Sequence, residues 1–416
     1  MPWQRRPFRD SLARTLCIAD LREIARRRIP HFAFEYLEGG AEDEATLRGN
    51  RTAFESWRFV PRTLVNTTGR HQRIELLGAE SKAPLVIAPT GMNGILNGEG
   101  DLGLARAAAK AGIPFCLSTV STTKLEEVAA KVDGRLWMQL YVMRDLKVAE
   151  NIVRRADAAG FEALVFTTDA NVFGHREWDR RNYVRPGRLK LRVMLDVLRH
   201  PTWLREVILR NGIPQFHNLA EMLPKGGASA IGGSTIIPSL FGPTITWADI
   251  DWLRGIWKRK LLIKGVLSVE DAERAAALGC DGIVLTNHGG RQLDSCVAPV
   301  EMVPEIAAAV GRKMTVIVDS GFRRGTDVVK ALALGAHAVM LGRATLYGLA
   351  AGGEAGVTRA LEILTAEIDR TLGHLGVCSI AELGPHLLRP APGTEAARVR
   401  NKTPPRRGRG APPGGR

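Results

Sequence analysis

The stretch that decides the fold reads Gly282-Ile283-Val284-Leu285-Thr286-Asn287-His288-Gly289-Gly290-Arg291-Gln292-Leu293-Asp294. Its first four residues are apolar and predict a buried parallel strand, so the polar residues begin where that strand ends. His288 titrates near neutral pH and can accept a proton, and Arg291 offers a planar fork for a carboxylate. The glycines between them allow the backbone to bring both side chains toward one ligand. The stretch therefore predicts a strand end that carries a base beside a cation.

Seven other short apolar runs occur between residues 83 and 341, most of them separated by Ala-rich helical stretches. The eight predicted strands are Leu85–Ala88, Pro114–Leu117, Leu136–Val142, Ala163–Thr167, Leu261–Ile263, Gly282–Leu285, Thr315–Val318 and Ala338–Leu341. The predicted helices between them include Leu102–Lys110, Ala149–Ala159, Val269–Ala277 and Thr326–Leu334. Such a pattern predicts a parallel sheet covered on both faces, and eight units predict a TIM (β/α)8 barrel. A doubly wound open sheet is the alternative architecture.

Three further segments surround the predicted barrel, which we expect to span residues 83–388. Residues 1–82 form an N-terminal helical segment, in which Asp20 caps a helix from Leu21 to Arg28 and Pro30 ends it. A second helix, His31–Glu38, precedes Ala41-Glu42-Asp43-Glu44, which is expected to open a third helix with acids in its first turn. An insertion at residues 178–258 is too long for an ordinary barrel connection. Residues 389–416, rich in Pro, Gly and Arg, are expected to be a disordered basic tail.

The composition is that of an ordinary soluble enzyme, with 45% hydrophobic residues and a formal net charge of +15. Much of the positive charge lies after Pro390, where seven Lys and Arg residues face Glu395 alone. The charge therefore says little about nucleic acid, and an anionic membrane surface or anionic ligands explain it equally well. The five cysteines are scattered and lack metal spacing, which favours a reducing cytoplasm and no metal site. The chain has no apolar run of about 18 residues, so we expect no segment that spans a bilayer.

Polar residues stand at the ends of all eight predicted strands. They are Pro89-Thr90-Gly91, Ser118-Thr119, Gln139 with Tyr141, Thr167 with Asp169, Lys264, His288 with Arg291, Asp319-Ser320-Gly321 with Arg323, and Gly342-Arg343. Each set alone is typical of turns and strand caps, but in a barrel all of them converge on one rim. The last two sets predict a phosphate site, because barrels often bind phosphate after strands seven and eight. Lys264 is expected to stabilise negative charge or to form a Schiff base, and the pattern does not separate these roles.

From about Leu21 to Leu383 the chain resembles the flavin mononucleotide (FMN)-dependent 2-hydroxy acid dehydrogenases and oxidases. The matching phrases are residues 40–44, Ala88-Pro-Thr-Gly91, Gln139-Leu-Tyr141, Thr286 through Asp294, and Asp319 through Asp327. The resemblance is strongest to the (S)-mandelate dehydrogenase branch, through residues 88–94, 319–324 and 341–350. It implies oxidation of an (S)-2-hydroxy acid to the 2-oxo acid, with the electrons passing to a quinone in the membrane.

The resemblance also implies a role for each residue on the rim. His288 is expected to be the base and Asp169 its partner, with Tyr141 on the substrate oxygen and Arg291, Arg176 and Tyr36 on the substrate carboxylate. Lys264 is expected near N1 and the C2 carbonyl of the flavin. The isoalloxazine is expected to contact Pro89, Thr90, Gly91, Ser118, Gln139, Thr167 and Thr286. The ribityl chain and phosphate are assigned to Asp319, Gly321, Arg323, Gly342 and Arg343.

Some positions depart from the family pattern. Val120 stands where glycolate oxidase-like members carry an aromatic residue, so aromatic substrates such as mandelate are favoured over lactate, and lactate over glycolate. Thr286 replaces a more usual Ser, Leu37 a second Tyr, and Gly91 an Ala that is common in oxidases. The alternatives are an L-lactate dehydrogenase or a glycolate-type oxidase, a non-redox phosphate-binding barrel that uses Lys264, and a membrane-attached scaffold without turnover.

Residues 189–209 of the insertion combine apolar side chains at helical spacing with neighbouring Lys and Arg residues. A basic amphipathic stretch of this kind can lie in a membrane interface, and a subunit contact or an active-site lid is the alternative. The resemblance implies peripheral attachment through about residues 188–222, at the inner face of the cytoplasmic membrane, and a homotetramer.

Overall fold

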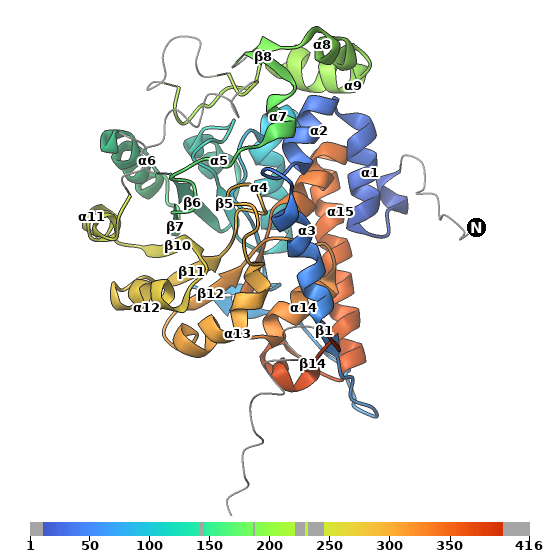
Figure 1. The fold of residues 1–416 in the computed structure, drawn as a ribbon, viewed down its shortest axis with the longest axis vertical. Helices are drawn as coiled ribbons and strands as arrows, with labels where there is room; N and C mark the ends of the chain where they lie inside the picture. Colours follow the sequence, from blue (N-terminus) through green and yellow to red (C-terminus); the bar gives the residue numbers. More distant parts are fainter. Residues whose placement is uncertain (1–10, 142–144, 186–187, 221–228, 232–244, 394–416) are drawn as a thin grey trace, which may run out of the picture.

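A closed barrel of eight parallel strands forms the centre of the molecule (Figure 1). The computed structural model describes residues 11–141, 145–185, 188–220, 229–231 and 245–393. Around the barrel, the strands follow in the order β10 (Lys260–Val266), β11 (Gly282–Leu285), β12 (Thr315–Val318), β13 (Ala338–Leu341), β4 (Leu85–Ile87), β5 (Phe115–Leu117), β6 (Leu136–Leu140) and β7 (Ala163–Thr167). Because β10 pairs with both β7 and β11, the sheet has no free edge. The predicted (β/α)8 barrel is confirmed, and the open-sheet alternative is wrong.

The strand bounds agree with the sequence pattern to within three residues. Four predicted strands, those now labelled β7, β11, β12 and β13, have the expected bounds. The strand β10 is longer than expected because it continues through Lys264 to Val266. The strand β6 ends at Leu140, so Tyr141 follows the strand, and Val142 lies outside the described residues.

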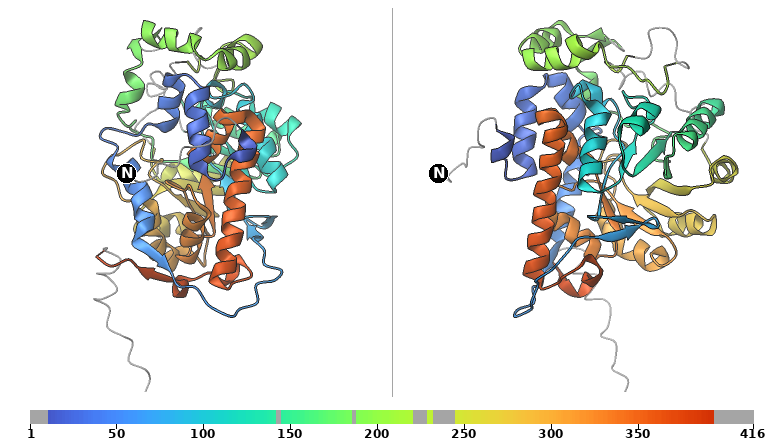
Figure 2. Two further views of the ribbon diagram at one scale, coloured as in Figure 1. Left: turned by 90° about the vertical axis from the view of Figure 1, so that its right-hand side faces the viewer. Right: turned by 180° about the vertical axis from the view of Figure 1, so that it is seen from behind.

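Helices cover the outside of the barrel, as Figure 2 shows from two further directions. They are α4 (Gly100–Ala111), α5 (Leu125–Lys131), α6 (Leu146–Ala158), α11 (Ala248–Ile256), α12 (Val269–Ala277), α13 (Pro299–Val310), α14 (Gly325–Ala333) and α15 (Arg343–Leu375). The helix α15 changes direction where Gly352 and Gly353 leave helical geometry. It packs against α4 and against the first N-terminal helix, so the N-terminal segment belongs to the same body as the barrel.

The N-terminal segment contains α1 (Ile18–Arg28), α2 (His31–Glu38) and α3 (Ala45–Thr52). The bounds of α2 are those predicted, but two expected helix starts are wrong. Asp20 is not the cap of α1: it lies inside the first turn, and its carboxylate accepts from the backbone N–H of Leu16 and Cys17. The acids at 42–44 precede α3 because Glu44 adopts a left-handed backbone, with φ of 59°.

Alternating residues of all eight strands form one apolar cluster inside the barrel. The inward-facing apolar side chains are Val86, Ala88, Cys116, Trp137, Ala163, Val165, Leu262, Val284, Ile317, Ala338 and Met340. The residues between them face the surrounding helices, because side chains alternate across a strand. Leu76, from the hairpin of β2 (Ile74–Leu76) and β3 (Ala79–Ser81), packs on this cluster and closes the amino-terminal end of the barrel. The carboxyl-terminal end is the one left for a ligand.

The insertion and the C-terminal segment contain regular structure of their own. After β7 come α7 (Glu177–Arg180), the hairpin β8 (Tyr183–Arg185) with β9 (Arg188–Leu189), α8 (Leu191–Leu198), α9 (Pro201–Trp203) and a π-helical segment, η4 (Leu204–Leu209). The helix α8 contacts α2 and projects beyond the barrel (Figure 2). The predicted tail begins too early, because Arg389 belongs to β14 (Leu388–Pro390), which pairs with β1 (Trp57–Phe59). The rest of that prediction, residues 394–416, lies outside the described residues.

Candidate active site

The alternation of inward-facing residues places a polar layer at the carboxyl-terminal end of the barrel. In each strand the next inward position after the last apolar one lies two residues further along. In seven of the strands those positions are Ser118, Gln139, Thr167, Lys264, Thr286, Asp319 and Gly342, whereas in β4 Ala88 is itself the last apolar residue. All the polar side chains among them are at most 7% exposed. The strand ends therefore meet at one rim, as the sequence predicted.

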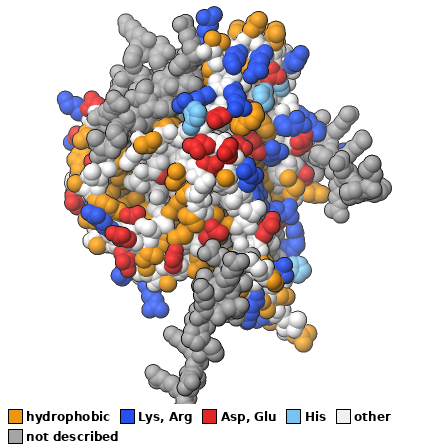
Figure 3. Space-filling model, viewed as in Figure 1, with side chains coloured by type: hydrophobic (Ala, Val, Ile, Leu, Met, Phe, Trp, Pro, Cys, Tyr) orange, Lys and Arg blue, Asp and Glu red, His pale blue; other side chains and the backbone are white. Residues whose placement is uncertain are grey.

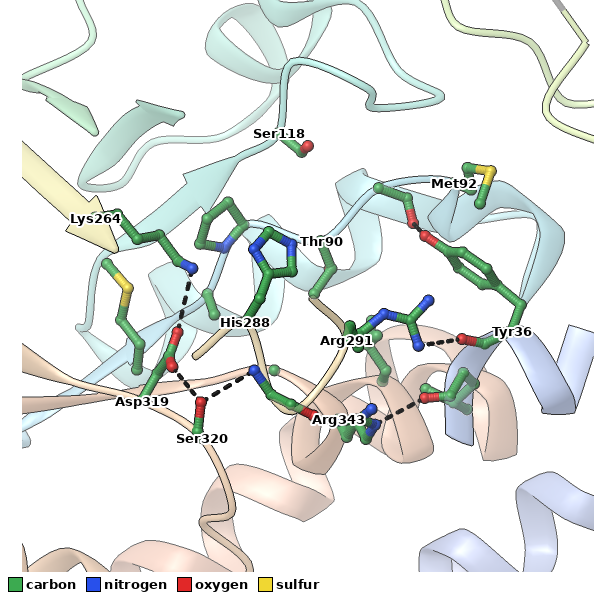
Figure 4. A pocket seen from close by; sticks show the side chains of 18 of the residues that line it. Tyr36, Thr90, Met92, Ser118, Lys264, His288, Arg291, Asp319, Ser320 and Arg343 are labelled. Atoms are coloured by element: carbon green, nitrogen blue, oxygen red, sulfur yellow. Dashed lines mark hydrogen bonds and ion pairs between the residues drawn. The ribbon is translucent and has the colours of Figure 1, made fainter. Parts of the chain in front are cut away.

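A cavity opens above this polar layer (Figure 4). It contains about 1080 Å³ of empty space, counted out to its open mouth. The predicted site residues that line it are Tyr36, Pro89, Thr90, Gly91, Ser118, Tyr141, Arg176, Lys264, His288, Arg291, Asp319, Gly321, Arg323, Gly342 and Arg343. Gln139, Thr167, Asp169 and Thr286 do not line the cavity and instead hold the lining from behind.

Hydrogen bonds within the polar layer show how these residues support the lining. The Gln139 amide donates to Thr167 Oγ1 at 3.0 Å and accepts from Ser118 Oγ at 3.2 Å. Thr286 Oγ1 accepts from the backbone N–H of His288 at 2.9 Å and lies 3.4 Å from Lys264 Nζ. Gln139 thus fixes Ser118, and Thr286 fixes His288 and Lys264, all of which face the cavity.

His288 lies between a carboxylate and a phenol. Its Nδ1 is 2.9 Å from Asp169 Oδ1, and its Nε2 is 3.3 Å from the Tyr141 hydroxyl. Burial lowers the pKa of His288, although the adjacent Asp169 carboxylate acts in the opposite direction. Burial acts to raise the pKa of Asp169, but the His288 ring and the Lys264 ammonium outweigh it and lower that pKa. At neutral pH the pair is therefore a neutral imidazole beside a carboxylate, which is ready to accept a proton at Nε2.

Two arginines lie on the side of the cavity that α2 and α7 form. Arg291 donates from one nitrogen to the carbonyls of Tyr36, at 2.8 Å, and Gly39, at 2.7 Å (Figure 4). Arg176 donates through Nε to the carbonyl of Arg291 at 3.2 Å. Burial and the Arg291 charge lower the pKa of Arg176 to about 10. Since a guanidinium has five N–H donors, both arginines retain donors for a carboxylate.

The rest of the cavity lining carries a second group of charges. Lys264 Nζ lies 3.5 Å from Asp319 Oδ2, and Asp319 Oδ1 accepts from Ser320 Oγ at 2.7 Å. Arg343 donates to the carbonyls of Leu37, Gly289 and Gly39, as the dashed contacts in Figure 4 partly show. Burial and the neighbouring Arg291 lower the pKa of Arg343 to about 9. These cations are closely packed and retain donors that the protein does not use.

Charge balance identifies the kind of ligand that the cavity accepts. Five cationic side chains line it, namely Arg176, Lys264, Arg291, Arg323 and Arg343, and the only lining carboxylate in the described part of the chain is Asp319. Buried charges are stable only when they are paired. Lys264 is paired with Asp319, which leaves Arg176 with Arg291 and Arg323 with Arg343, and the lining therefore suits two anionic groups at once.

The lining also fits FMN by criteria that do not depend on charge. Thr90 Oγ1 is buried and has no hydrogen-bond partner within the described residues. A Cβ added at Gly342 would meet no atom within 4 Å, so this strand end leaves open space beside Arg343. The first backbone N–H groups of α15 begin at the same place, and free amides of a helix N-terminus bind phosphate. Arg323, Gly342 and Arg343 could therefore hold a phosphate, and the polar-layer side chains that line the cavity, Ser118 and Lys264, could contact a planar ring.

Several lining residues were not singled out from the sequence as site residues. They are Met92, Phe173, Gly289, Ser320, Phe322, Met340 and Leu346. Most are apolar and carry no chemical signature, so only their places in the fold identify them. Ser320 and Gly289 were inside quoted motifs, and their hydrogen bond of 3.0 Å joins the ends of β11 and β12.

Comparison with known proteins agrees with this geometry. The model of the family "FMN-dependent dehydrogenase" matches residues 25–390. The chain is 46% identical to the (S)-mandelate dehydrogenase of Pseudomonas putida, over 89% of this chain and 93% of that protein. It is 41% identical to a putative L-lactate dehydrogenase of Mycobacterium tuberculosis, over 90% of this chain and 89% of that protein.

Solved structures give the same result. A crystal structure of the monotopic membrane protein (S)-mandelate dehydrogenase matches with a TM-score of 0.86 and 45% identity, over 91% of this chain and 100% of that one. A mandelate oxidase structure with (S)-2-phenylpropionate matches with a TM-score of 0.75 and 37% identity, over 91% and 98%. The barrel, the cavity with its five cationic side chains and these matches together show that the chain belongs to the family of FMN-dependent dehydrogenases.

Proposed function

We propose that this protein oxidises an (S)-2-hydroxy acid to the 2-oxo acid. The observation that carries the proposal is the position of His288, whose Nε2 faces the cavity beside the Tyr141 hydroxyl while Asp169 holds its Nδ1. A base held in this way next to two arginines suits a substrate that has both a hydroxyl and a carboxylate. FMN, when bound in the cavity, supplies the two-electron acceptor for the oxidation.

The residues of the chain divide the remaining work. Arg176 and Arg291 bind the substrate carboxylate, and the Tyr141 hydroxyl hydrogen-bonds the substrate oxygen. The imidazole of His288 takes a proton from the substrate at Nε2, and the Asp169 carboxylate stabilises the imidazolium that forms. Lys264 would place a buried positive charge beside N1 and the C2 carbonyl of the flavin. A fixed cation there lowers the energy of a transition state in which the ring gains negative charge.

The environment of Lys264 is evidence against the non-redox phosphate-binding barrel, in which this lysine would form a Schiff base. Burial acts to lower the pKa of its ammonium, but the carboxylates of Asp319 and Asp169 outweigh burial and raise that pKa. A Schiff base requires a neutral amine, and catalytic lysines have lowered pKa values for that reason. The environment of Lys264 therefore favours a fixed cation over a nucleophile.

An aromatic 2-hydroxy acid is the substrate that the lining suits best. The apolar side chains of Met92, Val120 and Phe173 line the cavity. A Cβ at Gly91 would lie 2.5 Å from Val120 Cγ2, so the small residue at 91 leaves room for the larger one at 120. We rank mandelate first, lactate second and glycolate third, in line with the mandelate-oxidising and lactate-oxidising relatives.

We also propose that the enzyme binds peripherally to the inner face of the cytoplasmic membrane. Side chains of α8 are strongly exposed, with Leu191 at 71%, Leu195 at 53% and Leu198 at 66%. Apolar and basic side chains gather side by side at the end of the molecule where Figure 1 places α8 and α9 (Figure 3). Within the described residues, no helix has the length and apolar character needed to cross a membrane. This position suits transfer of electrons to a quinone, and we further propose a homotetramer, by resemblance to the family.

The first prediction concerns His288. Anaerobic mixing of the wild-type protein with (S)-mandelate should bleach the flavin, faster than with L-lactate or glycolate. His288→Asn should retain FMN but bleach about 10²- to 10⁴-fold more slowly, because a general base contributes that much. The flavin spectrum before mixing is the control for cofactor content. A variant that bleaches within about tenfold of the wild type would contradict the assignment.

The second prediction concerns pH. Because the pKa of His288 is lowered, its neutral form persists below the usual value of about 6.5. The kcat/KM profile should therefore stay level down to that pH and fall only as the imidazole protonates. In Asp169→Asn the carboxylate that supports the proton on His288 is lost, so the plateau should drop and the acid limb should move to still lower pH. An acid limb that moves to higher pH in this variant would contradict the proposed pairing of Asp169 with His288.

The third prediction concerns the membrane. Replacing Leu191, Leu195 and Leu198 together by Ser should lower partitioning onto vesicles that contain anionic phospholipid by at least about tenfold, because each leucine loses apolar burial worth more than about 1 kcal/mol. Leu64→Ser is the matched control, since Leu64 is fully exposed in the segment after β1. Cosedimentation measures both. Equal partitioning of the triple variant and the control would show that α8 is not the attachment surface.

A further inference from the structure

The loop that carries His288 has an unusual backbone. Three consecutive residues, His288, Gly289 and Gly290, have positive φ angles of 57°, 67° and 74°. The left-handed conformation suits the glycines but is unfavourable for a residue with a Cβ, such as His288. A backbone of this kind persists only where surrounding contacts determine it. The direction of the His288 ring therefore depends on whatever holds this loop.

The side chain of Asn287 closes the loop from within, beside the contacts that Ser320 and Arg343 make with Gly289. Its Oδ1 accepts from the backbone N–H of Gly290 at 3.1 Å, and its Nδ2 donates to the carbonyl of Val297 at 3.0 Å. Its remaining donor and acceptor pair with Asn50, which donates to Asn287 Oδ1 at 2.9 Å and accepts from Asn287 Nδ2 at 2.7 Å. An amide has two donors and two acceptor sites, so Asn287 is fully satisfied.

Asn50 lies on α3, far away in the sequence and on a separate element. Both amides are buried, with Asn50 at 2% and Asn287 at 5% exposure. Other contacts hold α3 against the same loop: the Asp294 carboxylate accepts from the backbone N–H of Ala45 at 3.1 Å and of Thr46 at 2.7 Å. A Cβ at Gly290 would lie 2.7 Å from the backbone nitrogen of Leu47, so the helix and the loop touch directly. The helix α3 thus acts as a support for the loop.

We propose that Asn50 is a positioning residue for the oxidation, acting through Asn287 to fix the backbone from which His288 reaches the substrate. The kinetic part of this inference rests on the function proposed above. Asn50 does not line the cavity. Its loss should therefore lower kcat while the affinity for FMN and the KM for the hydroxy acid change little.

Asn50→Asp tests the inference because it keeps the size of the side chain. The ionised carboxylate of this variant can still accept from Asn287 Nδ2, but it has no N–H for Asn287 Oδ1 and places two oxygens against each other. We expect kcat to fall by at least about tenfold, because small displacements of a reacting group have effects of this size. Asn50→Ser, which keeps a hydroxyl donor, should give a smaller loss and serves if the Asn50→Asp variant does not fold.

Gly49→Ala is the matched control on the same helix. A Cβ at this position meets nothing within 4 Å, and Ala stabilises a helix relative to Gly. The control should leave kcat unchanged, and the double variant Gly49→Ala/Asn50→Asp should remain as slow as Asn50→Asp. Recovery of kcat in the double variant would mean that Asn50 only stabilises α3, and it would overturn the proposal, as would an unchanged kcat in Asn50→Asp.

Amide hydrogen exchange gives a readout that does not need turnover. In the holoenzyme, the peptide that covers residues 286–293 should exchange faster in Asn50→Asp than in the wild type or Gly49→Ala, because the closed amide pair no longer protects the loop. Unchanged protection would overturn the proposal. If the wild type bleached with no 2-hydroxy acid, the proposed function would fail, and exchange alone would still decide whether Asn50 holds this loop.

Discussion

Unbalanced positive charge at the mouth of the barrel is the constraint on which the rest of the structure depends. Five cationic side chains line one cavity with a single carboxylate among the described residues of the lining. Their crowding and burial lower the pKa of Arg343 to about 9 and that of Arg176 to about 10. Burying cations is costly unless anions accompany them. In the function proposed here, the FMN phosphate and a substrate carboxylate supply these anions, so binding of both ligands should also stabilise the folded cavity.

Backbone carbonyls hold the cations in place until the ligands bind. The last carbonyls of α2 and the adjoining Gly39 accept from both Arg291 and Arg343. The carboxyl end of a helix is its negative pole, which makes it suitable for this contact. One short helix thereby positions two of the cations that line the cavity, and it also contributes Tyr36 to the lining. The N-terminal segment is therefore part of the active site.

The sequence predicted the barrel and its polar rim because both follow from local rules. Apolar runs of strand length can be recognised in the sequence without tertiary information. The residues that follow each run can be recognised in the same way. The predicted cap of α1 and the predicted start of α3 were wrong. Acidic residues occur both just before a helix and in its first turn, so residue type alone did not place Asp20 or Glu44. The strand β14 was missed because its partner, β1, is more than 300 residues away and each strand has only three residues. Nor could sequence reveal that Arg291 and Arg343 bond to carbonyls, or that Asn50 pairs with Asn287, since these contacts join distant segments.

The most direct test compares two substrates of the same shape, one with a carboxylate and one with a neutral amide in its place. Anaerobic stopped-flow mixing of the holoenzyme with (S)-mandelate and with the neutral (S)-mandelamide would follow flavin absorbance in each case. The account predicts that the amide reduces the flavin less efficiently by on the order of a hundredfold or more, because Arg176 and Arg291 lose a charge-assisted pair of hydrogen bonds. Equal efficiency with both compounds would contradict the claim that Arg176 and Arg291 bind the substrate carboxylate.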